Sequence, residues 1–283
     1  MLHAADRRFP LDRPLLMGIV NVTPDSFSDG GRAYDAAAAL AHGVALVEAG
    51  ADLLDVGGES TRPGAAAIDE AEELRRVLPV IGALAARGFA VSVDTSKPGV
   101  MRAALAAGAV MVNDVRALAE PGALDVVAAS GAAVCLMHMQ GAPRTMQAAP
   151  AYTDVVAEVR DFLAARVAAC VAAGVARERI VVDPGFGFGK TLEHNLALLK
   201  NLHRIADGVP VLAGLSRKSM LGALTGRGVG EREFAGVAAH LAAVMRGAKI
   251  LRVHDVAAMR DALAVWRAVD NAGAENNSVE ETN

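Results

Sequence analysis

The 283-residue chain lacks the features that mark several protein classes. Its two cysteines, Cys135 and Cys170, form no CxxC pair and cannot build a disulfide scaffold, so we expect both to be buried core residues. No apolar run reaches the roughly 18 residues that a membrane span needs, and residues 1–14 lack a signal-peptide core. The net charge of -4 offers no basic surface for nucleic acid. These absences favour a cytoplasmic enzyme that binds neither membranes nor nucleic acids.

Common nucleotide and metal motifs are also missing. No GxGxxG follows the first apolar run, and no HxH, HExxH or Cys/His cluster predicts a tight zinc site. The stretch Gly185–Thr191 imitates a phosphate loop, but Pro184 stands where GxxxxGK[ST] requires its first glycine. Four histidines fall in helix-like stretches, where an exposed or hydrogen-bonded ring is the expected state: His42, His194, His203 and His240.

Eight short apolar runs alternate with helix-like stretches along the chain. The runs are Leu15–Val20, Leu53–Val56, Val91–Val93, Val110–Val112, Ala133–Met137, Ile180–Val182, Val209–Ala213 and Ile250–Val253. Apolar runs without polar alternation are typical of parallel strands that are buried on both faces. Eight such units predict an α/β fold, a single-domain (β/α)8 TIM barrel over residues 15–270. Residues 1–14 are expected to form an N-terminal arm, and the polar residues 271–283 a disordered tail.

The unusual polar residues follow the predicted strands, where barrel enzymes carry their chemistry. The longest stretches without a regular pattern, 21–34, 57–68 and 138–152, all follow strands, and loops of this length usually carry function. The chain has only five lysines, and three of them lie in these polar clusters: Lys97, Lys190 and Lys218.

Asp94, Asn113 and Asp183 each come directly after a predicted strand and should surround the mouth of the barrel. Two carboxylates and an amide suit the edge of an amino-pyrimidinone, which offers adjacent N–H donors beside a carbonyl. The alternative is that Asp94 and Asp183 only cap the helices that follow them. Three such positions together with Lys218 favour a binding site.

A second set of residues suits an anion. Its members, drawn from the first, second and eighth strand ends, are Asn21, Thr61, Arg62, Arg252 and His254. Arginine offers the bidentate geometry that phosphate prefers, and the other side chains are small donors or cations. The alternative is that Arg62 and Arg252 form surface ion pairs. Convergence of the strand ends favours the anion site.

Taken together, these motifs resemble those of the dihydropteroate synthases. Two long signatures carry the resemblance: Met17-Gly-Ile-Val-Asn-Val-Thr-Pro-Asp-Ser-Phe-Ser-Asp-Gly-Gly31 and Asp55-Val-Gly-Gly-Glu-Ser-Thr-Arg-Pro-Gly64. Shorter motifs follow in order: Val91–Lys97, Val112–Val115, Met137–Gln140, Asp183–Gly189, Ser216–Ser219 and Arg252–Asp255. The resemblance covers about residues 15–270, with no motif missing.

The resemblance implies a reaction between 6-hydroxymethyl-7,8-dihydropterin diphosphate and p-aminobenzoate, which gives 7,8-dihydropteroate and pyrophosphate for folate synthesis. It implies Asp94, Lys218, Arg252 and His254 as catalytic residues. Asp94, Asn113, Asp183 and Lys218 would bind the pterin, with Arg252 stacked on its face, and Met137 and Gly214 would be further substrate-binding residues. The diphosphate would be held by Asn21, Thr61, Arg62, Arg252 and His254. Phe27, Pro63, Phe186 and Ser219 would shape the aminobenzoate slot, with Asp29 near the amine. Mg²⁺ would be reached through Asn21, and the enzyme would be a homodimer.

The implied mechanism is an SN1-like displacement in which diphosphate leaves a pterin methylene cation beside Asp94. Two other functions remain open for such a barrel. A pterin-dependent methyltransferase domain would share the Asp/Asn contacts but not, as we interpret that family, Ser216–Ser219 and Thr61–Pro63. A non-catalytic pterin-binding paralogue would be expected to lose Arg62, Lys218 or His254, and all three are present.

Overall fold

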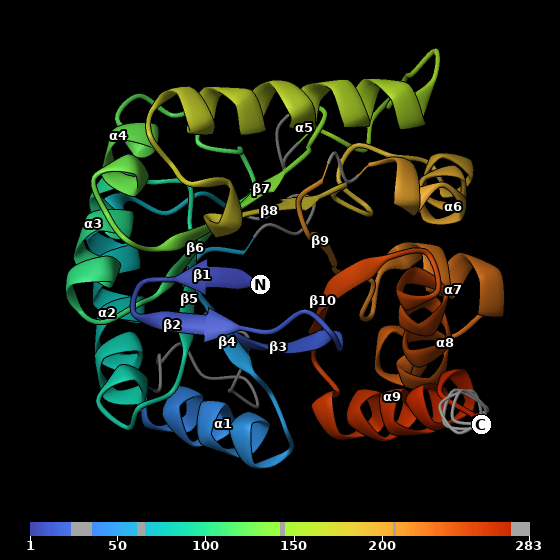
Figure 1. Cartoon of the computed structure of the whole chain (residues 1–283), viewed down its shortest axis with the longest axis horizontal. Helices are drawn as coiled ribbons and strands as arrows, with labels where there is room; N and C mark the ends of the chain where they lie inside the picture. Colours follow the sequence, from blue (N-terminus) through green and yellow to red (C-terminus); the bar gives the residue numbers. More distant parts are fainter. Residues whose placement is uncertain (24–35, 61–65, 142–144, 206–207, 273–283) are drawn as a thin grey trace, which may run out of the picture.

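The computed structural model describes residues 1–23, 36–60, 66–141, 145–205 and 208–272. Eight parallel strands close into a barrel in the order β10-β3-β4-β5-β6-β7-β8-β9, which confirms the predicted TIM barrel (Figure 1). The barrel strands are β3 (Leu15–Asn21), β4 (Leu53–Gly57), β5 (Val91–Asp94), β6 (Met111–Asp114), β7 (Ala133–Met137), β8 (Ile180–Asp183), β9 (Val211–Ala213) and β10 (Ala248–Val253). Each overlaps one of the eight apolar runs.

Helices surround the barrel on the outside (Figure 1). They are α1 (Ala36–Glu48), α2 (Glu70–Ala85), α3 (Pro98–Ala106), α4 (Ala123–Ala128), α5 (Val155–Ala172), α6 (Leu192–Lys200), α7 (Ser219–Thr225), α8 (Glu233–Val244) and α9 (Val256–Asp270). Several starts are fixed by local capping. Asp69 accepts a hydrogen bond from the Glu72 N–H at the start of α2, and Thr191 caps α6 by accepting from the His194 N–H. Side-chain caps of this kind satisfy N–H groups that a helix cannot bond internally.

The barrel strands are apolar on both faces because each face packs against a different core. Outward residues such as Leu54 and Val56 pack under the helices, whereas inward residues such as Leu53 fill the barrel. Cys135 is fully buried inside the barrel, Cys170 is fully buried on the inner side of α5, and both are free thiols, as predicted.

An antiparallel hairpin closes the end of the barrel at which the strands begin. It consists of β1 (Leu2–Ala4) and β2 (Arg7–Phe9), and it lies across the barrel in Figure 1. Leu2 and Ala4 are fully buried against the inward residues of the barrel, and the Ala5 N–H donates to the Gly131 carbonyl at 2.8 Å. The predicted N-terminal arm is therefore an integral plug of the barrel, which leaves the carboxyl ends of the strands for chemistry.

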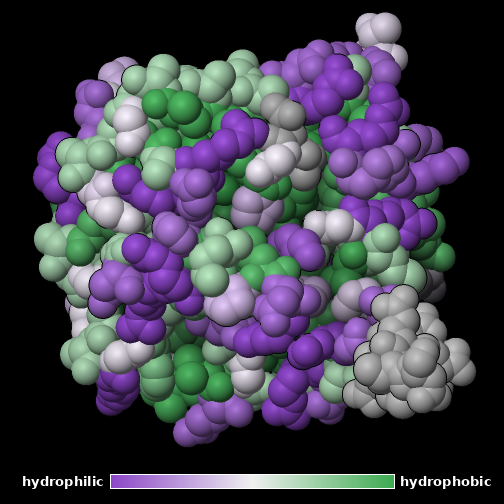
Figure 2. Space-filling view, viewed as in Figure 1, coloured by the Kyte–Doolittle hydropathy of each residue, from purple (hydrophilic) through white to green (hydrophobic). Residues whose placement is uncertain are grey.

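Hydrophilic residues are interspersed with apolar ones across the face of the molecule seen in Figure 2. Within the described ranges, no helix has the length and apolar character required to cross a membrane. Residues 273–283 lie outside the described residues, so the predicted disorder of the tail stays a prediction.

Candidate active site

Inward-facing polar residues meet at the carboxyl ends of the strands. Asp94 ends β5, and its Cα partner on β6 is Asn113. Asp183 ends β8, where its Cα partner on β7 is Met137, and Arg252 lies near the end of β10. Since parallel register places these positions at one level, four side chains predicted from separate motifs surround the barrel mouth. The helix-capping alternative is wrong, because α3 begins after Lys97 and α6 after Thr191.

Arg252 links two carboxylates across this mouth. Its Nε lies 2.6 Å from Asp55 Oδ2, and its Nη2 lies 2.8 Å from Asp94 Oδ2. Asn113 Nδ2 donates to the same Asp55 oxygen at 2.9 Å. The Arg252 side chain is only 22% exposed, so it belongs to the interior of the barrel and the surface-pair alternative is wrong for this residue.

Burial changes the ionisation of these groups. It raises the pKa of Asp94 to about 7, although the positive charge of Arg252 opposes the rise. It also raises the pKa of Asp183, against a hydrogen bond from the Gly185 N–H and the charge of Lys218. For Arg252, burial lowers the pKa, but Asp55 and Asp94 outweigh it and raise the value overall. The site therefore holds a permanently charged guanidinium and a carboxyl group that titrates near neutrality.

Lys218 lies next to this group, at the start of α7. It is half-buried, and its Nζ lies 4.2 Å from the centroid of the Phe188 ring. Burial lowers the pKa of Lys218 to about 8, while Asp183 opposes that change. The preceding residue, Arg217, has a positive φ of 59°, and Arg232 donates to the carbonyls of both Arg217 and Lys218. This turn directs the ammonium toward the strand ends.

Comparisons with known proteins decide the family. A family profile described as pterin binding enzyme matches residues 17–254. The dihydropteroate synthase of Escherichia coli strain K12 is 50% identical over 273 residues, which are 96% of this chain and 97% of the relative. The chain belongs to the dihydropteroate synthases, transferases of folate synthesis.

Solved structures agree with this assignment. A Xanthomonas albilineans dihydropteroate synthase with 4-aminobenzoic acid is 60% identical, with a TM-score of 0.87 over 92% of this chain and 94% of that one. A Burkholderia cenocepacia dihydropteroate synthase complexed with 7,8-dihydropteroate is 51% identical, with a TM-score of 0.89 over 97% of this chain and 98% of that one. The likeness thus spans nearly the whole chain.

Phe186 corrects one prediction from the sequence. The family resemblance implied that Phe186 shapes the aminobenzoate slot. This side chain is 1% exposed and packs in the core between barrel and helices. Phe188, two residues later and partly exposed, is the aromatic residue against Lys218. Phe186 and Phe188 have the same residue type and similar neighbours in the sequence. Only the three-dimensional path of the loop shows which ring faces the core and which faces Lys218.

Of the remaining predicted site residues, some lie within the described ranges and others lie outside them. Asn21 ends β3 and is half-buried, and His254 follows β10 with its Nδ1 3.0 Å from Ser216 Oγ. Ser219 is the first residue of α7 and is exposed. Gly214 borders both Arg252 and Asp183, since a Cβ there would lie 3.9 Å from Arg252 Cβ and 4.0 Å from Asp183 Oδ2. Five predicted residues lie outside the described ranges: Phe27, Asp29, Thr61, Arg62 and Pro63.

The other two lysines of the polar clusters hold loops together. Lys190 is 3% exposed, and its Nζ lies 3.0 Å from His138 Nδ1 while donating to the carbonyls of Gly185 at 3.0 Å and Phe188 at 2.9 Å. It thereby joins the loops that follow β7 and β8. Lys97 pairs with Glu59 and Glu73. Lys218 remains the one of the three with its ammonium against an aromatic ring beside the strand ends.

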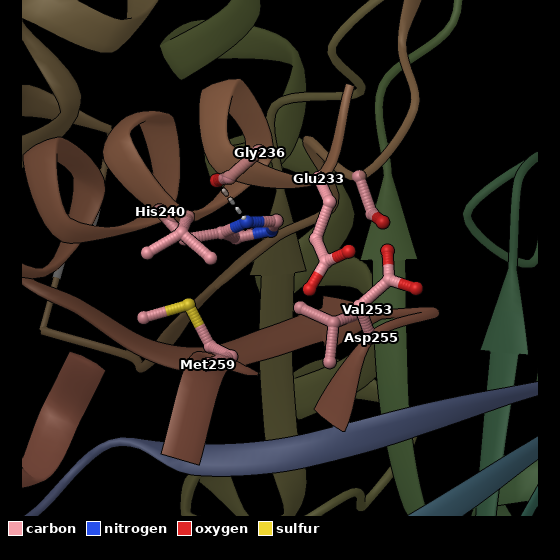
Figure 3. A pocket seen from close by; sticks show the side chains of 8 residues that line it. Glu233, Gly236, His240, Val253, Asp255 and Met259 are labelled. Atoms are coloured by element: carbon pink, nitrogen blue, oxygen red, sulfur yellow. Dashed lines mark hydrogen bonds between the residues drawn. The ribbon is translucent and has the colours of Figure 1, made fainter. Parts of the chain in front are cut away.

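His240 confirms the prediction of a hydrogen-bonded helix histidine. Its Nδ1 lies 2.8 Å from the Gly236 carbonyl (Figure 3), and its Nε2 accepts from the Leu215 N–H at 3.2 Å. Burial lowers the pKa of this ring to about 4, so it is neutral. The cavity beside it, with a volume of about 10 Å³, has room for about one water and not for a substrate. His240 therefore supports the segment that carries Ser216 and Lys218.

Asp55 is the residue that motif reasoning missed. It begins the second signature, yet it lies inside an apolar run and received no role. In the structure it is fully buried and bonded to both Arg252 and Asn113. A carboxylate within a strand that is otherwise buried and apolar was the available signal, because such a charge requires a partner.

Proposed function

We propose that this chain condenses 6-hydroxymethyl-7,8-dihydropterin diphosphate with p-aminobenzoate by breaking the pterin–diphosphate bond before the amine attacks. The observation that carries this proposal is the buried group of Asp94, Arg252 and Asp55 at the strand ends of a barrel from this family. It offers acceptors for pterin N–H groups and a fixed negative charge near a developing cation.

Pterin recognition would rest on hydrogen-bond acceptors. Asp94 on β5 and Asp183 on β8 provide carboxylate oxygens, and Asn113 on β6 provides an amide, all at the carboxyl ends of their strands. Lys218 adds a donor for the ring carbonyl or a ring nitrogen. The planar guanidinium of Arg252 would stack on the pterin face. Met137 and Gly214 would border the ring, since Met137 pairs with Asp183 and Gly214 lies beside Asp183 and Arg252.

The diphosphate would be held by cations and small donors. Arg252 and His254 are described here, and Thr61 and Arg62 lie outside the described residues. No group of three or more His, Cys, Asp or Glu side chains among the described residues could hold a metal. A single amide oxygen from Asn21 still fits Mg²⁺, which keeps several waters and binds through substrate phosphates. The chemistry that the ion supplies when bound is neutralisation of charge on the leaving diphosphate.

The chemical step needs no protein nucleophile. The bond between the pterin methylene and the diphosphate oxygen breaks, and its electron pair leaves with pyrophosphate. Asp94 stabilises the resulting cation, and the neutral amine of p-aminobenzoate attacks it and then loses a proton. Phe188, Lys218 and Ser219 would form the described part of the aminobenzoate slot. Phe27, Asp29 and Pro63 would complete the slot from outside the described residues.

The other two functions make different demands. A methyltransferase would need no anionic leaving group, so Lys218, Arg252 and His254 would have no joint purpose. A binding paralogue would tolerate loss of His254. Relatives that are 50% identical over nearly the whole chain and are named dihydropteroate synthase favour the synthase.

The purified chain should release pyrophosphate only when both substrates and Mg²⁺ are present. The expected second product is 7,8-dihydropteroate, identified by mass. Pyrophosphate release without p-aminobenzoate would indicate hydrolysis, and binding of the pterin without any product would support the paralogue. EDTA should abolish turnover and excess Mg²⁺ should restore it.

We also propose that two copies pair through the α7–α8 region. Four large apolar side chains are exposed there: Leu224 (54%), Val229 (56%), Phe234 (83%) and Met245 (62%). Val265 (67%) and Val269 (70%) are also exposed on α9, which packs against α8, and neighbouring exposed apolar residues are typical of an interface.

Phe234→Glu is therefore expected to convert a dimer of the chain into a monomer, measured by sedimentation velocity. Phe234 is the most exposed of these apolar side chains, and a charge buried in its place at an apolar interface would destabilise the dimer. Val171→Glu on α5, where the residue is 45% exposed, is the matched control and should leave the dimer intact. A monomeric wild-type chain, or a dimer unaffected by Phe234→Glu, would contradict the assignment.

The chain is proposed to work in the cytoplasm. Both cysteines are free and buried, which suits a reducing compartment.

A further inference from the structure

Asp55 is given no contact with a substrate in the reaction described above, although it bonds to two residues that are given one. It points inward from β4 and is fully buried. Its Oδ2 accepts hydrogen bonds from the Arg252 Nε at 2.6 Å and the Asn113 Nδ2 at 2.9 Å. The two residues that would contact opposite parts of the pterin, its face and its edge, thus share one oxygen atom.

We propose that Asp55 is a positioning residue that fixes the acceptor side of Asn113 and the plane of Arg252 toward the pterin. This inference rests on the proposed function. It adds a residue that determines specificity without touching the substrate.

The Asn113 amide can present either a carbonyl or an NH₂ group to a ligand. Because its Nδ2 donates to Asp55, its Oδ1 points along the other branch of the amide. Asn113 then adds an acceptor to those of Asp94 and Asp183. Three acceptors match a pyrimidinone edge that carries an amino group and a ring N–H. The reversed amide would place N–H groups against N–H groups and leave buried donors unpaired.

Arg252 is shared between two carboxylates of different exposure. Asp55 is 0% exposed and takes Nε, whereas Asp94 is 14% exposed and takes Nη2. When Asp94 turns an oxygen to the substrate, Asp55 can keep the guanidinium plane in place. Without Asp55, Asp94 would have to give up its contact with Arg252 in order to bind the pterin.

This sharing also affects the titration of Asp94. Apart from burial, the charged groups that act on Asp94 are Arg252 from β10, Asp55 from β4, Glu73 from α2 and Asp114 from β6, with Arg252 lowering and the three acids raising its pKa. Lys218, at the start of α7, is a further cation close enough to be affected by Asp94. A neutral residue at position 55 removes one negative charge near Asp94. The positive charge of Arg252 is then paired with Asp94 alone.

The first test is Asp55→Asn in the full chain. The acid limb of the profile of kcat/KM for the pterin diphosphate against pH is expected to move down by about one pH unit, because a like charge is lost and an opposite charge is gained. Ser92→Ala is the matched control: Ser92 is the Cα partner of Asp55 on β5, fully buried, and its Oγ makes no hydrogen bond to any described residue. The control should leave the limb in place.

The second test is Asp55→Leu, which removes the acceptor but keeps the branched shape of the side chain. The pterin KM is expected to rise about tenfold or more, and discrimination against the 2-oxo analogue of the pterin to fall by a similar factor, with the aminobenzoate KM changing less. A structural defect alone would lower the melting temperature without changing that discrimination.

The outcomes separate the two proposals. Wild-type chain that makes no dihydropteroate overturns the proposed function. An active wild type whose acid limb is unmoved by Asp55→Asn overturns the inference, as does a Ser92→Ala profile that shifts equally. If both variants fail to fold, NMR of the wild-type Asn113 side-chain amide decides: slow exchange that persists with 6-hydroxymethylpterin bound supports the inference, and fast exchange overturns it.

Discussion

Asp94→Asn is expected to lower kcat by at least about 10²-fold, the scale of a preorganised charge in a site that excludes water. The amide keeps the shape and one acceptor but loses the negative charge beside the methylene cation. An interaction made mainly in the transition state affects kcat, whereas uniform binding affects KM alone. Pterin affinity should therefore weaken less than kcat. An unchanged kcat with a raised pterin KM would make Asp94 a recognition residue only.

The pH dependence of Asp94 provides an internal control. Since burial raises its pKa to about 7, kcat/KM of the wild type should fall as pH drops through 7, and Asp94→Asn should lack that limb. The free energy of unfolding depends on pH with the opposite sign. A carboxyl group with a raised folded pKa lowers the free energy of unfolding as pH rises from about 4 to about 7. At pH 8 the variant should be at least as stable as wild type, so lost activity would not reflect lost folding.

Lys218→Ala is expected to reduce kcat/KM for both substrates about tenfold or more, because one ammonium group serves the pterin and the adjoining slot. A hydrogen bond to a charged group contributes about 1.5–3 kcal/mol. Steady-state kinetics with each substrate varied in turn measures the effect. Lys200→Ala on α6, where the residue is exposed, is the control and should behave as wild type. Values near wild type for both substrates would remove Lys218 from the site.

Lys218 should also define the alkaline limb of the profile. Burial lowers its pKa to about 8, so the cation is lost as pH rises through that value. Lys218→Arg keeps its positive charge throughout the pH range of the assay, so the alkaline limb should disappear from the pH profile. The variant should lose some activity because a guanidinium differs in geometry from an ammonium group. An alkaline limb that persists in Lys218→Arg would assign it to another group.

Much of the barrel could be predicted from the sequence because strands buried on both faces leave a strong signal. Each of the eight apolar runs overlaps a strand, and the run Ala133–Met137 matches β7 at both ends. The plug of residues 1–14 could not be predicted in the same way. Its two strands have three residues each, too short for a periodic pattern, and Leu2 is buried only because the barrel end lies against it.

The site was predictable to the extent that its residues follow strands. Asp94, Asn113, Asp183 and Arg252 were placed at the mouth on that basis, and the structure brings them together. Asp55 was missed because a residue inside a strand looks structural until its partners are known. Phe186 was chosen over Phe188 because alternating Gly-Phe gives no indication of which ring faces the core.

The central claim is that the bond to diphosphate breaks before the amine attacks. The most direct measurement is the α-secondary deuterium isotope effect at the pterin methylene, taken on the chemical step in single-turnover experiments. A methylene that becomes planar and cationic gives a large normal effect, and this is the expected result. An effect close to unity would indicate attack concerted with departure, which would contradict the cation and the part assigned to Asp94.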